Sequence, residues 1–250
     1  MSFQGKVAIV TGGGSGFGRA IALALAGKGA AVAVVDLNEA AAQQVAAEIV
    51  AAGGRALAVG ADIGTRAGAE QAVGETVKAM DGLDILVNNA GIPQKVMFFA
   101  DLDDAKLDQL LAVNVKSIYY CTAAAFPHMK EKGGSVVNIT SVAATRPRPG
   151  LVAYAASKAA AQVLTKGLAL DLAPHSIRMN SVAPVAGDTP MLAQFIGERS
   201  QAKDADYAST IPLRRLCQPQ DVAAAVLYLA SDDASMVTGA EILVDGGRGI

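Results

Sequence analysis

The sequence lacks several features that mark common classes of protein. It has no tryptophan, only 4% aromatic residues and two histidines. Its two cysteines, Cys121 and Cys217, stand far apart and form no metal-ligand spacing, so we expect reduced thiols in a cytoplasmic protein and no metal site. Lys and Arg number 21 against 23 Asp and Glu, with both signs interspersed. A nucleic-acid partner is therefore not expected.

Long apolar runs are also missing. The longest one, residues 21–35, is interrupted by Lys28 and by two glycines, whereas a membrane-spanning helix needs about 20 consecutive apolar residues. The apolar run 7–10 is too short for a signal peptide and is followed by glycines. We therefore expect neither secretion nor a membrane partner.

What the sequence does contain is a regular alternation of short apolar runs and longer Ala-rich segments of helical period. The runs predict strands at 6–11, 31–36, 56–60, 83–87, 135–140, 177–182 and 241–244, and the segments predict helices at 17–28, 39–52, 67–80, 104–132, 152–173, 191–203 and 220–230. The first strands are apolar on both faces, as in parallel strands covered by helices on both sides. The pattern predicts an α/β protein, one Rossmann-type doubly wound domain over residues 1–250 with a parallel sheet of about seven strands.

A glycine cluster, Thr11-Gly-Gly-Gly-Ser-Gly-Phe-Gly18, directly follows the first predicted strand. Such a turn lets backbone N–H groups approach phosphate oxygens at the positive end of the next helix. The spacing does not fit Gly-x-Gly-x-x-Gly, and a plain loop is the alternative. The position between a first strand and a first helix favours a dinucleotide site, with the candidate contacts Gly12, Ser15, Gly16, Phe17 and Gly18.

Asp36 ends the second predicted strand and is the candidate that selects the cofactor. An acid at this position accepts hydrogen bonds from the adenosine ribose and repels a 2′-phosphate. The alternative is an ordinary loop acid. Because no Lys or Arg follows closely, the sequence favours NAD over NADP.

Tyr154 and Lys158 are four residues apart in a predicted helix, so their side chains would share a face. A free tyrosine, with a pKa of about 10, releases its proton poorly at neutral pH. A nearby cation lowers that pKa toward the range of a general acid/base. A surface pair is the alternative, and only the surrounding motifs distinguish the two.

Together these motifs resemble the short-chain dehydrogenase/reductase family, nearly end to end. Besides the glycine turn and the Tyr/Lys pair, the matching residues are Asp62, Asn88-Asn-Ala-Gly91, Asn114, Ser141 and the closing Val244-Asp-Gly-Gly247. The resemblance also implies a homotetramer in which the helices that carry Asn114 and Tyr154 pack between subunits. The small side chains Ala155, Ala159, Ala160 and Val163 suit such a contact, as they would suit core packing.

The resemblance implies four catalytic roles. Tyr154 would be the general acid/base, and Lys158 would lower its pKa and bind the nicotinamide ribose. Ser141 would hold and polarise the substrate oxygen, and Asn114 would anchor a water that leads protons from Lys158 to solvent. Alternatively, Ser141 and Asn114 would be buried polar groups satisfied by backbone.

Further cofactor contacts are implied in three other segments. They are Asp62 and Ile63 at the adenine, Asn88 near the adenosine ribose, Ala90 and Gly91 where the backbone approaches the cofactor, and Pro184 and Thr189 beside the nicotinamide. Asn88 and Asn89 would alternatively make turn hydrogen bonds. One departure is Val185, which stands where the family commonly has glycine, so we expect a different loop path with Gly187 supplying the flexibility.

The substrate-binding residues are predicted from two segments. Arg146 and Arg148 lie between Ser141 and Tyr154 in a proline-rich run and would bind a carboxylate or phosphate; the alternative is a solvated loop or a subunit contact. Residues 187–206 would form a lid with Met191 as a substrate contact and an apolar inner face of Met191, Leu192, Phe195 and Ile196, or else would only pack as a helix.

The sequence thus predicts an NAD-dependent oxidoreductase that interconverts a secondary alcohol and a ketone on a small, polar, hydroxylated or carboxylated substrate. A 3-oxoacyl thioester reductase is the alternative within the family, and Asp36 counts against it because such reductases usually use NADP. A non-catalytic NAD-binding regulatory protein is the alternative from another class. It would need the glycine turn and Asp36 but not Ser141, Tyr154 and Lys158.

Overall fold

Seven parallel strands form the single sheet at the centre of the molecule, in the order β3-β2-β1-β4-β5-β6-β7. The computed structural model describes residues 1–250 except for the side chain of Ile196. The strands are β1 (Val7–Thr11), β2 (Ala31–Asp36), β3 (Arg55–Gly60), β4 (Ile85–Asn88), β5 (Gly134–Ile139), β6 (Ile177–Pro184) and β7 (Glu241–Val244). The predicted fold, with each predicted strand, is confirmed.

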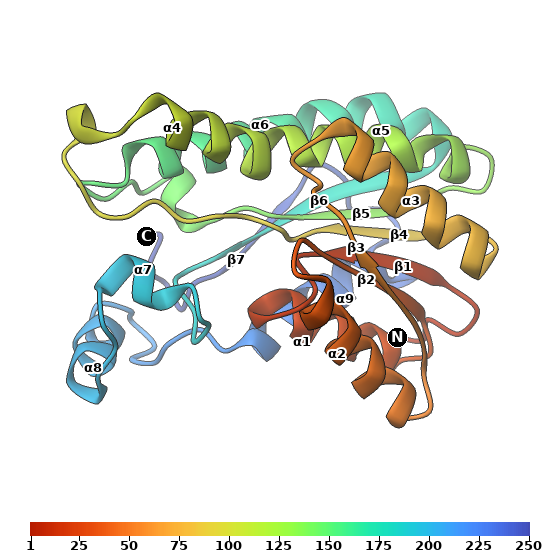
Figure 1. Ribbon diagram of the computed structural model, residues 1–250, viewed down its shortest axis with the longest axis horizontal. Helices are drawn as coiled ribbons and strands as arrows, with labels where there is room; N and C mark the ends of the chain where they lie inside the picture. The colour runs from red at the N-terminus through yellow and green to blue at the C-terminus, as the bar shows by residue number, and fades with distance from the viewer.

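Helices cover both faces of this sheet (Figure 1). One layer contains α3 (Arg66–Met80), α4 (Asp104–Leu111), α5 (Ser117–Met129) and α6 (Val152–Leu172), and the other contains α1 (Gly16–Ala26), α2 (Glu39–Ala51) and α9 (Pro219–Ala230). Along β1, Ala8 and Val10 enter the core beneath α1, α2 and α9, whereas Ile9 enters the core beneath α3 and α5. This alternation follows from the two-residue period of a strand, and it explains why a doubly covered strand is apolar throughout.

The strand order reverses between β1 and β4. The chain first builds outward from β1 through β2 to β3, and then returns to place β4 on the other side of β1. The loops that leave the carboxyl ends of β1 and β4 therefore diverge toward opposite layers. This divergence opens a crevice at the edge where ligands bind in open α/β sheets.

Two predicted helices are interrupted. The helix predicted at 104–132 contains a π-helical turn, Ala112–Lys116, between α4 and α5. The helix predicted at 191–203 is divided into α7 (Leu192–Ile196) and α8 (Gln201–Ser209). Gly197 between them has φ +78°, which a helix does not accommodate, and the Ser200 side chain then caps α8 by accepting from the Lys203 N–H at 3.2 Å. α7 and α8 lie near the C-terminus, apart from the two helical layers (Figure 1).

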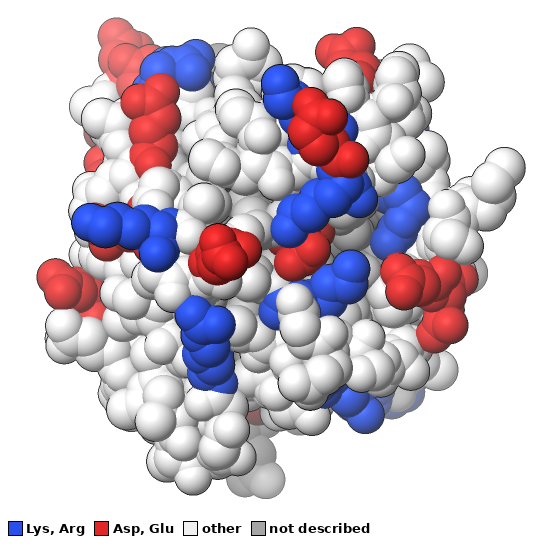
Figure 2. Space-filling model, turned by 90° about the vertical axis from the view of Figure 1, so that its right-hand side faces the viewer, with Lys and Arg blue, Asp and Glu red and all other residues white. Residues whose placement is uncertain are grey.

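Charged side chains of both signs mix on the end of the molecule that lies away from α7 and α8 (Figure 2). At the amino ends of the strands, Asp84 pairs with Lys132 at 3.2 Å and with Lys6 at 3.9 Å. That face carries no extended basic surface, in agreement with the composition. Within the described residues, no helix combines the length and apolarity that a membrane crossing requires.

Candidate functional site

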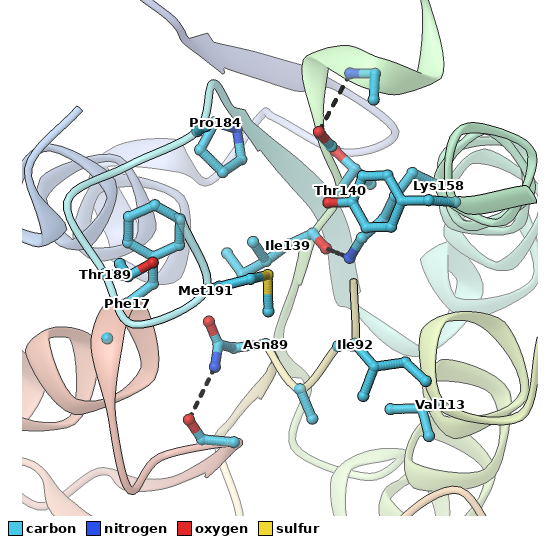
Figure 3. A pocket seen from close by; sticks show the side chains of 18 of the residues that line it. Phe17, Asn89, Ile92, Val113, Ile139, Thr140, Lys158, Pro184, Thr189 and Met191 are labelled. Carbon is cyan, nitrogen blue, oxygen red and sulfur yellow. Dashed lines mark hydrogen bonds between the residues drawn. The ribbon is translucent and has the colours of Figure 1, made fainter. Parts of the chain in front are cut away.

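One cavity of about 600 Å³ runs along the carboxyl ends of the strands, from the glycine turn to α6 and α7. Figure 3 shows Phe17 and Thr189 on one side of this cavity and Lys158 on the other, with Ile139 and Met191 between them. Its walls come from segments far apart in the sequence, since the sheet brings the ends of β1, β2, β4, β5 and β6 to one edge. Of the predicted site residues, Gly18, Asn88 and Asn114 do not line it.

The glycine turn packs so closely that side chains would not fit. Gly12 has φ +61°, and a Cβ there would lie 2.9 Å from the Ala90 Cα. A Cβ at Gly18 would collide with the carbonyl oxygen of Gly12. Ser15 precedes α1 in extended conformation and its side chain makes no capping hydrogen bond. The first N–H groups of α1 therefore remain available to an anionic group beside Ser15, Gly16 and Phe17, which line the cavity.

Asn88 and Asn89 have different positions and roles. The Asn88 side chain is buried, donates to the Asn138 Oδ1 at 2.8 Å and does not line the cavity, so the predicted position of Asn88 near a ribose stays a prediction. Successive side chains at a strand end point to opposite faces, and Asn89 is the one that lines the cavity. Its amide donates to the carbonyls of Thr11 at 2.8 Å and Gly12 at 3.1 Å. These are the turn hydrogen bonds that were the alternative in the sequence interpretation.

Asp36 lies at the end of β2 and holds the glycine turn in place. Its Oδ2 accepts from the Gly14 N–H and its Oδ1 from the Asn38 N–H, each at 2.9 Å. A carboxylate offers about four acceptor sites, so both oxygens can accept further hydrogen bonds. Asp62 follows β3, where its Oδ1 accepts from the Gly64 N–H at 3.0 Å, and Ile63 beside it is buried. Asp36, Asp62 and Ile63 line the same end of the cavity.

Ser141 and Tyr154 meet at the other end. Ser141 follows β5, and its Oγ accepts from the Ala143 N–H at 3.2 Å. Tyr154 is 7% exposed on the first turn of α6. Burial raises the pKa of Tyr154 to about 12, while a hydrogen bond with the Ser141 side chain lowers it and Tyr207 raises it further. The two side chains that the sequence assigned to the substrate oxygen therefore lie at the same end of the cavity, close enough for Ser141 to affect the pKa of Tyr154.

Lys158 lies one turn further along α6 and is 4% exposed. Its Nζ donates to the Ile139 carbonyl at 2.9 Å (Figure 3). Burial lowers the pKa of this ammonium to about 8. Burial, Ser141 and Tyr207 are the causes that shift the pKa of Tyr154 in the chain alone, and the predicted lowering of that pKa by Lys158 stays a prediction.

Asn114 lies in the π-helical turn and is fully enclosed. It accepts from the Ile92 N–H at 2.8 Å and donates to the Ile92 carbonyl at 3.1 Å and to the Ser157 Oγ at 3.0 Å. A Cβ at Gly91 would lie 3.3 Å from both the Asn114 Oδ1 and the Lys158 Nζ. Asn114 thus joins α6 to the segment after β4, and its role in a proton path stays a prediction. A π turn inside a helix is often found at functional sites.

The loop after β6 faces the glycine turn. Pro184 ends β6, and Val185 follows with its side chain in the core and its N–H donating to the Val244 carbonyl at 3.2 Å; both residues line the cavity. The flexibility expected of Gly187 stays a prediction, and the structure shows another reason for glycine at this position. A Cβ there would lie 2.5 Å from the Phe17 ring, so glycine is needed for close contact. Thr189 lies against Gly16, with its Cβ 3.3 Å from where a Gly16 Cβ would be.

The two predicted substrate arginines differ. Arg146 donates to the carbonyl oxygens of Arg248 and, at 3.3 Å, Ile250, so it holds the C-terminal segment against the cavity. Arg148 lies with its guanidinium carbon 5.6 Å from the centre of the Tyr207 ring in α8. Both line the cavity, and so does Arg248, which the sequence interpretation missed because nothing in the closing segment links it to position 146.

The first part of the predicted lid, up to Phe195, lines this end of the cavity. Met191, Leu192 and Phe195 line it, and the Phe195 ring contacts the Tyr154 ring edge-on with centroids 5.3 Å apart. Three residues of the predicted apolar inner face thus line the cavity, and their role in a lid stays a prediction; the side chain of Ile196 lies outside the described residues. Arg199 joins the ends of this segment, since it pairs with Asp188 at 2.7 Å and with Asp204 at 2.6 Å.

Comparisons with known proteins agree with this geometry. Residues 12–248 match the family model described as enoyl-(acyl carrier protein) reductase. The chain is 46% identical to a 4-formylbenzenesulfonate dehydrogenase from Comamonas testosteroni, over 100% of both chains. It is 40% identical to a cyclopentanol dehydrogenase from Comamonas sp., over 97% of this chain and 96% of that protein. It superposes with a TM-score of 0.93 and 41% identity on a 3-ketoacyl-(acyl-carrier-protein) reductase from Brucella melitensis complexed with NADH, covering 100% of each chain.

Proposed function

The chain belongs to the short-chain dehydrogenase/reductase family, and on that basis we propose that it oxidises a secondary alcohol to a ketone, or runs the reverse reaction, with NAD(H). The observation that carries this proposal is that Ser141, Tyr154 and Lys158 line one end of a cavity that begins at a glycine turn. A protein that only bound a dinucleotide would need the turn but not a buried tyrosine, serine and lysine together.

Ser141, Tyr154 and Lys158 have different roles in the proposed reaction. In the oxidation, Ser141 would hold the substrate hydroxyl, and the Tyr154 phenolate, formed once its own proton has left by way of Lys158, would take the hydroxyl proton at Oη. The hydride would leave the carbon that bears this hydroxyl and pass to NAD. In the reduction, Tyr154 returns the proton to the carbonyl oxygen. Lys158 keeps a positive charge within the buried site, and a proton leaving Tyr154 would pass along Lys158 toward the Asn114 segment.

The residues present fit NAD(H), which supplies the hydride acceptor or donor when bound. The glycine turn leaves a cradle that side chains would fill, and the N–H groups of α1 face it. The Asp36 carboxylate would accept hydrogen bonds from the ribose hydroxyls and would repel a 2′-phosphate. Asp62 and Ile63 would contact the adenine. The backbone at Ala90 and Gly91 would approach the cofactor, and Pro184 and Thr189 would lie beside the nicotinamide.

Nicotinamide absorbance tests the proposal. The purified protein is incubated with NAD or NADP and with alcohols, polyols, sugar acids and hydroxy acids, and NADH formation is followed. We expect turnover with NAD on at least one alcohol and at least about tenfold less with NADP, since a phosphate beside a carboxylate costs several kcal/mol. A better rate with NADP would contradict the assignment of Asp36.

For the substrate, we propose a ring-bearing alcohol with an anionic group. The carboxylates that line the cavity among the described residues, Asp36 and Asp62, lie at the opposite end from Tyr154, whereas Arg146, Arg148 and Arg248 lie near it. None of the described ion pairs involves these arginines. Two relatives are named for ring substrates, one of them a sulfonate. Because the guanidinium of Arg146 holds the C-terminal segment, Arg148 and Arg248 would bind the anion.

A matched pair of alcohols tests this proposal. 4-(1-Hydroxyethyl)benzoate carries a carboxylate that 1-phenylethanol lacks, and the two share the reacting carbon. We expect kcat/KM to favour the anion by at least about tenfold, and Arg148→Gln and Arg248→Gln each to remove most of that preference, as for a charge-assisted hydrogen bond. An unchanged preference in both variants would contradict the assignment, while turnover of 1-phenylethanol would still support the reaction class.

A 3-oxoacyl thioester reductase is the second candidate, favoured by the likeness to the reductase from Brucella melitensis. Such a substrate is long and flexible, whereas the cavity is lined by the rigid rings of Phe195, which contacts Tyr154, and of Pro147 in the Arg146 segment. Oxidation of NADH by a 3-oxoacyl thioester faster than by any cyclic ketone would establish this alternative.

We also propose a homotetramer in the cytoplasm. α6 presents an exposed apolar row at helical spacing, namely Val152, Ala156, Ala160, Val163, Gly167 and Leu170. This row replaces the face expected from the sequence, because Ala155 is buried within the subunit. Both cysteines are free and buried, as in a reducing compartment. Light scattering of Val163→Asp beside the wild type tests the assembly.

We further propose that residues 187–206 act as the lid of each subunit.

A further inference from the structure

Gln94 is a buried residue that neither the family motifs nor the proposed chemistry uses. It follows β4, is 1% exposed, and makes two hydrogen bonds to a segment about 60 positions later in the chain. Its Oε1 accepts from the backbone N–H of Tyr154 at 2.9 Å, and its Nε2 donates to the carbonyl of Gly150 at 3.2 Å. Both polar atoms of a fully buried amide are thus directed at the start of α6.

This start of α6 lacks a local cap. The residue before the helix is Leu151, which has no side-chain acceptor, and Tyr154 is the third residue of the helix. The N–H of a third helical residue has no partner within the helix. It normally donates a hydrogen bond to a capping Ser, Thr or Asp side chain. Gln94 takes the place of that cap from a distant loop.

We propose that Gln94 is a positioning residue, which fixes the first turn of α6 and thereby sets the Tyr154 hydroxyl against Ser141. The proposal rests on the proposed function only in its kinetic consequence. The contact itself is a property of the fold, so it can be measured without a substrate.

Two neighbouring contacts make this arrangement rigid. Asn114 holds Ile92, two residues before Gln94, by a pair of hydrogen bonds at 2.8 and 3.1 Å. Gly150 accepts a second hydrogen bond, from the Met97 N–H at 3.2 Å, and has φ +79°. A Cβ at Gly150 would lie 2.7 Å from the Val96 side chain, so this turn packs directly on the loop. Removing Gln94 would leave the Tyr154 N–H buried without a partner, and the first turn of α6 would shift to reach another acceptor.

Such a shift has a specific consequence for the proton transfer. The hydrogen bond with Ser141 lowers the pKa of Tyr154 against a much larger effect of burial. Losing the interaction with Ser141 would raise the pKa of Tyr154. The pH at which kcat for oxidation reaches its maximum would therefore increase. Because Gln94 does not line the cavity and its side-chain hydrogen bonds go to Gly150 and Tyr154, NADH binding would be retained.

Three variants separate this role from general stability. Gln94→Met keeps the size of the side chain and removes both hydrogen bonds, while Gln94→Glu keeps the acceptor for the Tyr154 N–H. Ser135→Ala is the control, because it removes a buried hydrogen bond of 3.0 Å to the Leu229 carbonyl at the far end of β5. Each variant is compared with the wild type by kcat, KM, the pH profile of kcat, the Kd for NADH and amide hydrogen exchange of the peptide around Tyr154.

We expect Gln94→Met to lose about 10- to 100-fold in kcat, the size of effect that a misplacement of about 1 Å produces. Its kcat profile for oxidation should move to higher pH, and exchange at the start of α6 should accelerate, with NADH binding retained. Gln94→Glu should keep kcat within about threefold, since the capping acceptor remains. Ser135→Ala should lose stability but neither kcat nor protection at α6.

Two results would overturn the proposal. One is an unchanged exchange rate at the start of α6 in Gln94→Met. The other is a loss of kcat equal to that of Ser135→Ala with no change of the pH profile. If the wild type itself turned over no alcohol or ketone, the proposed function would fail, whereas the exchange data would still decide whether Gln94 caps α6.

Discussion

Adding one methyl group at Gly18 tests the close packing between the glycine turn and α1. A Cβ at this position would overlap the Gly12 carbonyl oxygen and would lie 2.8 Å from its carbon and 2.5 Å from the Asn89 Nδ2. Unstrained contacts between such atoms are about 3.5 Å, so α1 and the turn would have to separate by about 1 Å. The backbone N–H groups that face the proposed phosphates would move with them.

The expected loss follows from the hydrogen bonds at stake. A hydrogen bond to a charged group contributes about 1.5–3 kcal/mol, and each 1.4 kcal/mol is about tenfold in Kd. Weakening one such contact in Gly18→Ala should therefore raise the Kd for NADH about 10- to 100-fold. Fluorescence titration of NADH measures it directly.

Gly74 provides the matched control within the same fold. It lies in α3, and a Cβ there would meet nothing within 4 Å. Gly74→Ala should leave the Kd for NADH unchanged and should stabilise the protein by about 0.5–1 kcal/mol, because alanine favours the helix more than glycine does. A Gly18→Ala protein that folds and binds NADH like the wild type would refute the packing argument.

Three further substitutions test other parts of the site. Lys158→Met should abolish turnover but raise the melting temperature at pH 7, because burial lowers the pKa of Lys158 from 10.5 to about 8. Between about pH 8 and pH 10.5 the unfolded chain binds a proton at Lys158 that the folded chain does not. The free energy of unfolding of the wild type should therefore rise with pH across this range, by up to about 3 kcal/mol. Thermal unfolding of Lys158→Met over the same pH range should not show this rise. Asp36→Asn should raise the NADP/NAD ratio of kcat/KM at least about tenfold, since it removes the charge that repels the 2′-phosphate; an unchanged ratio would contradict the role of Asp36. Ser141→Ala should lower kcat about 100-fold and move its profile for oxidation to higher pH, and a profile that stays in place would show that Ser141 does not act on Tyr154.

The sequence predicted the fold well because its signals were local. Each strand of the sheet was a short apolar run, and the glycine turn, Asp36, Ser141, Tyr154 and Lys158 were found at the ends of predicted elements. The topology then brought these ends to one edge, as expected for a doubly wound sheet. Apart from the two predicted helices that are interrupted, only the limits of elements moved, by a few residues.

What could not be predicted depended on direction and on long-range contact. Asn88 and Asn89 are neighbours of the same type, and only the orientation of β4 decides which one lines the cavity. The contact of Gln94 with Tyr154 and that of Arg146 with the C-terminal segment join parts of the chain that share no local pattern. The pKa of Tyr154 depends on burial, which the spacing of Tyr154 and Lys158 does not reveal.

The most direct test of the central assignment is the turnover of Tyr154→Phe beside the wild type, on the best alcohol from the cofactor screen and with the Kd for NADH measured in parallel. The substitution removes only the hydroxyl that transfers the proton. We expect unchanged NADH binding and a kcat lower by about 100- to 10,000-fold, the usual contribution of a general acid/base. Equal kcat in the two proteins would contradict the assignment of Tyr154 as the proton-transferring residue.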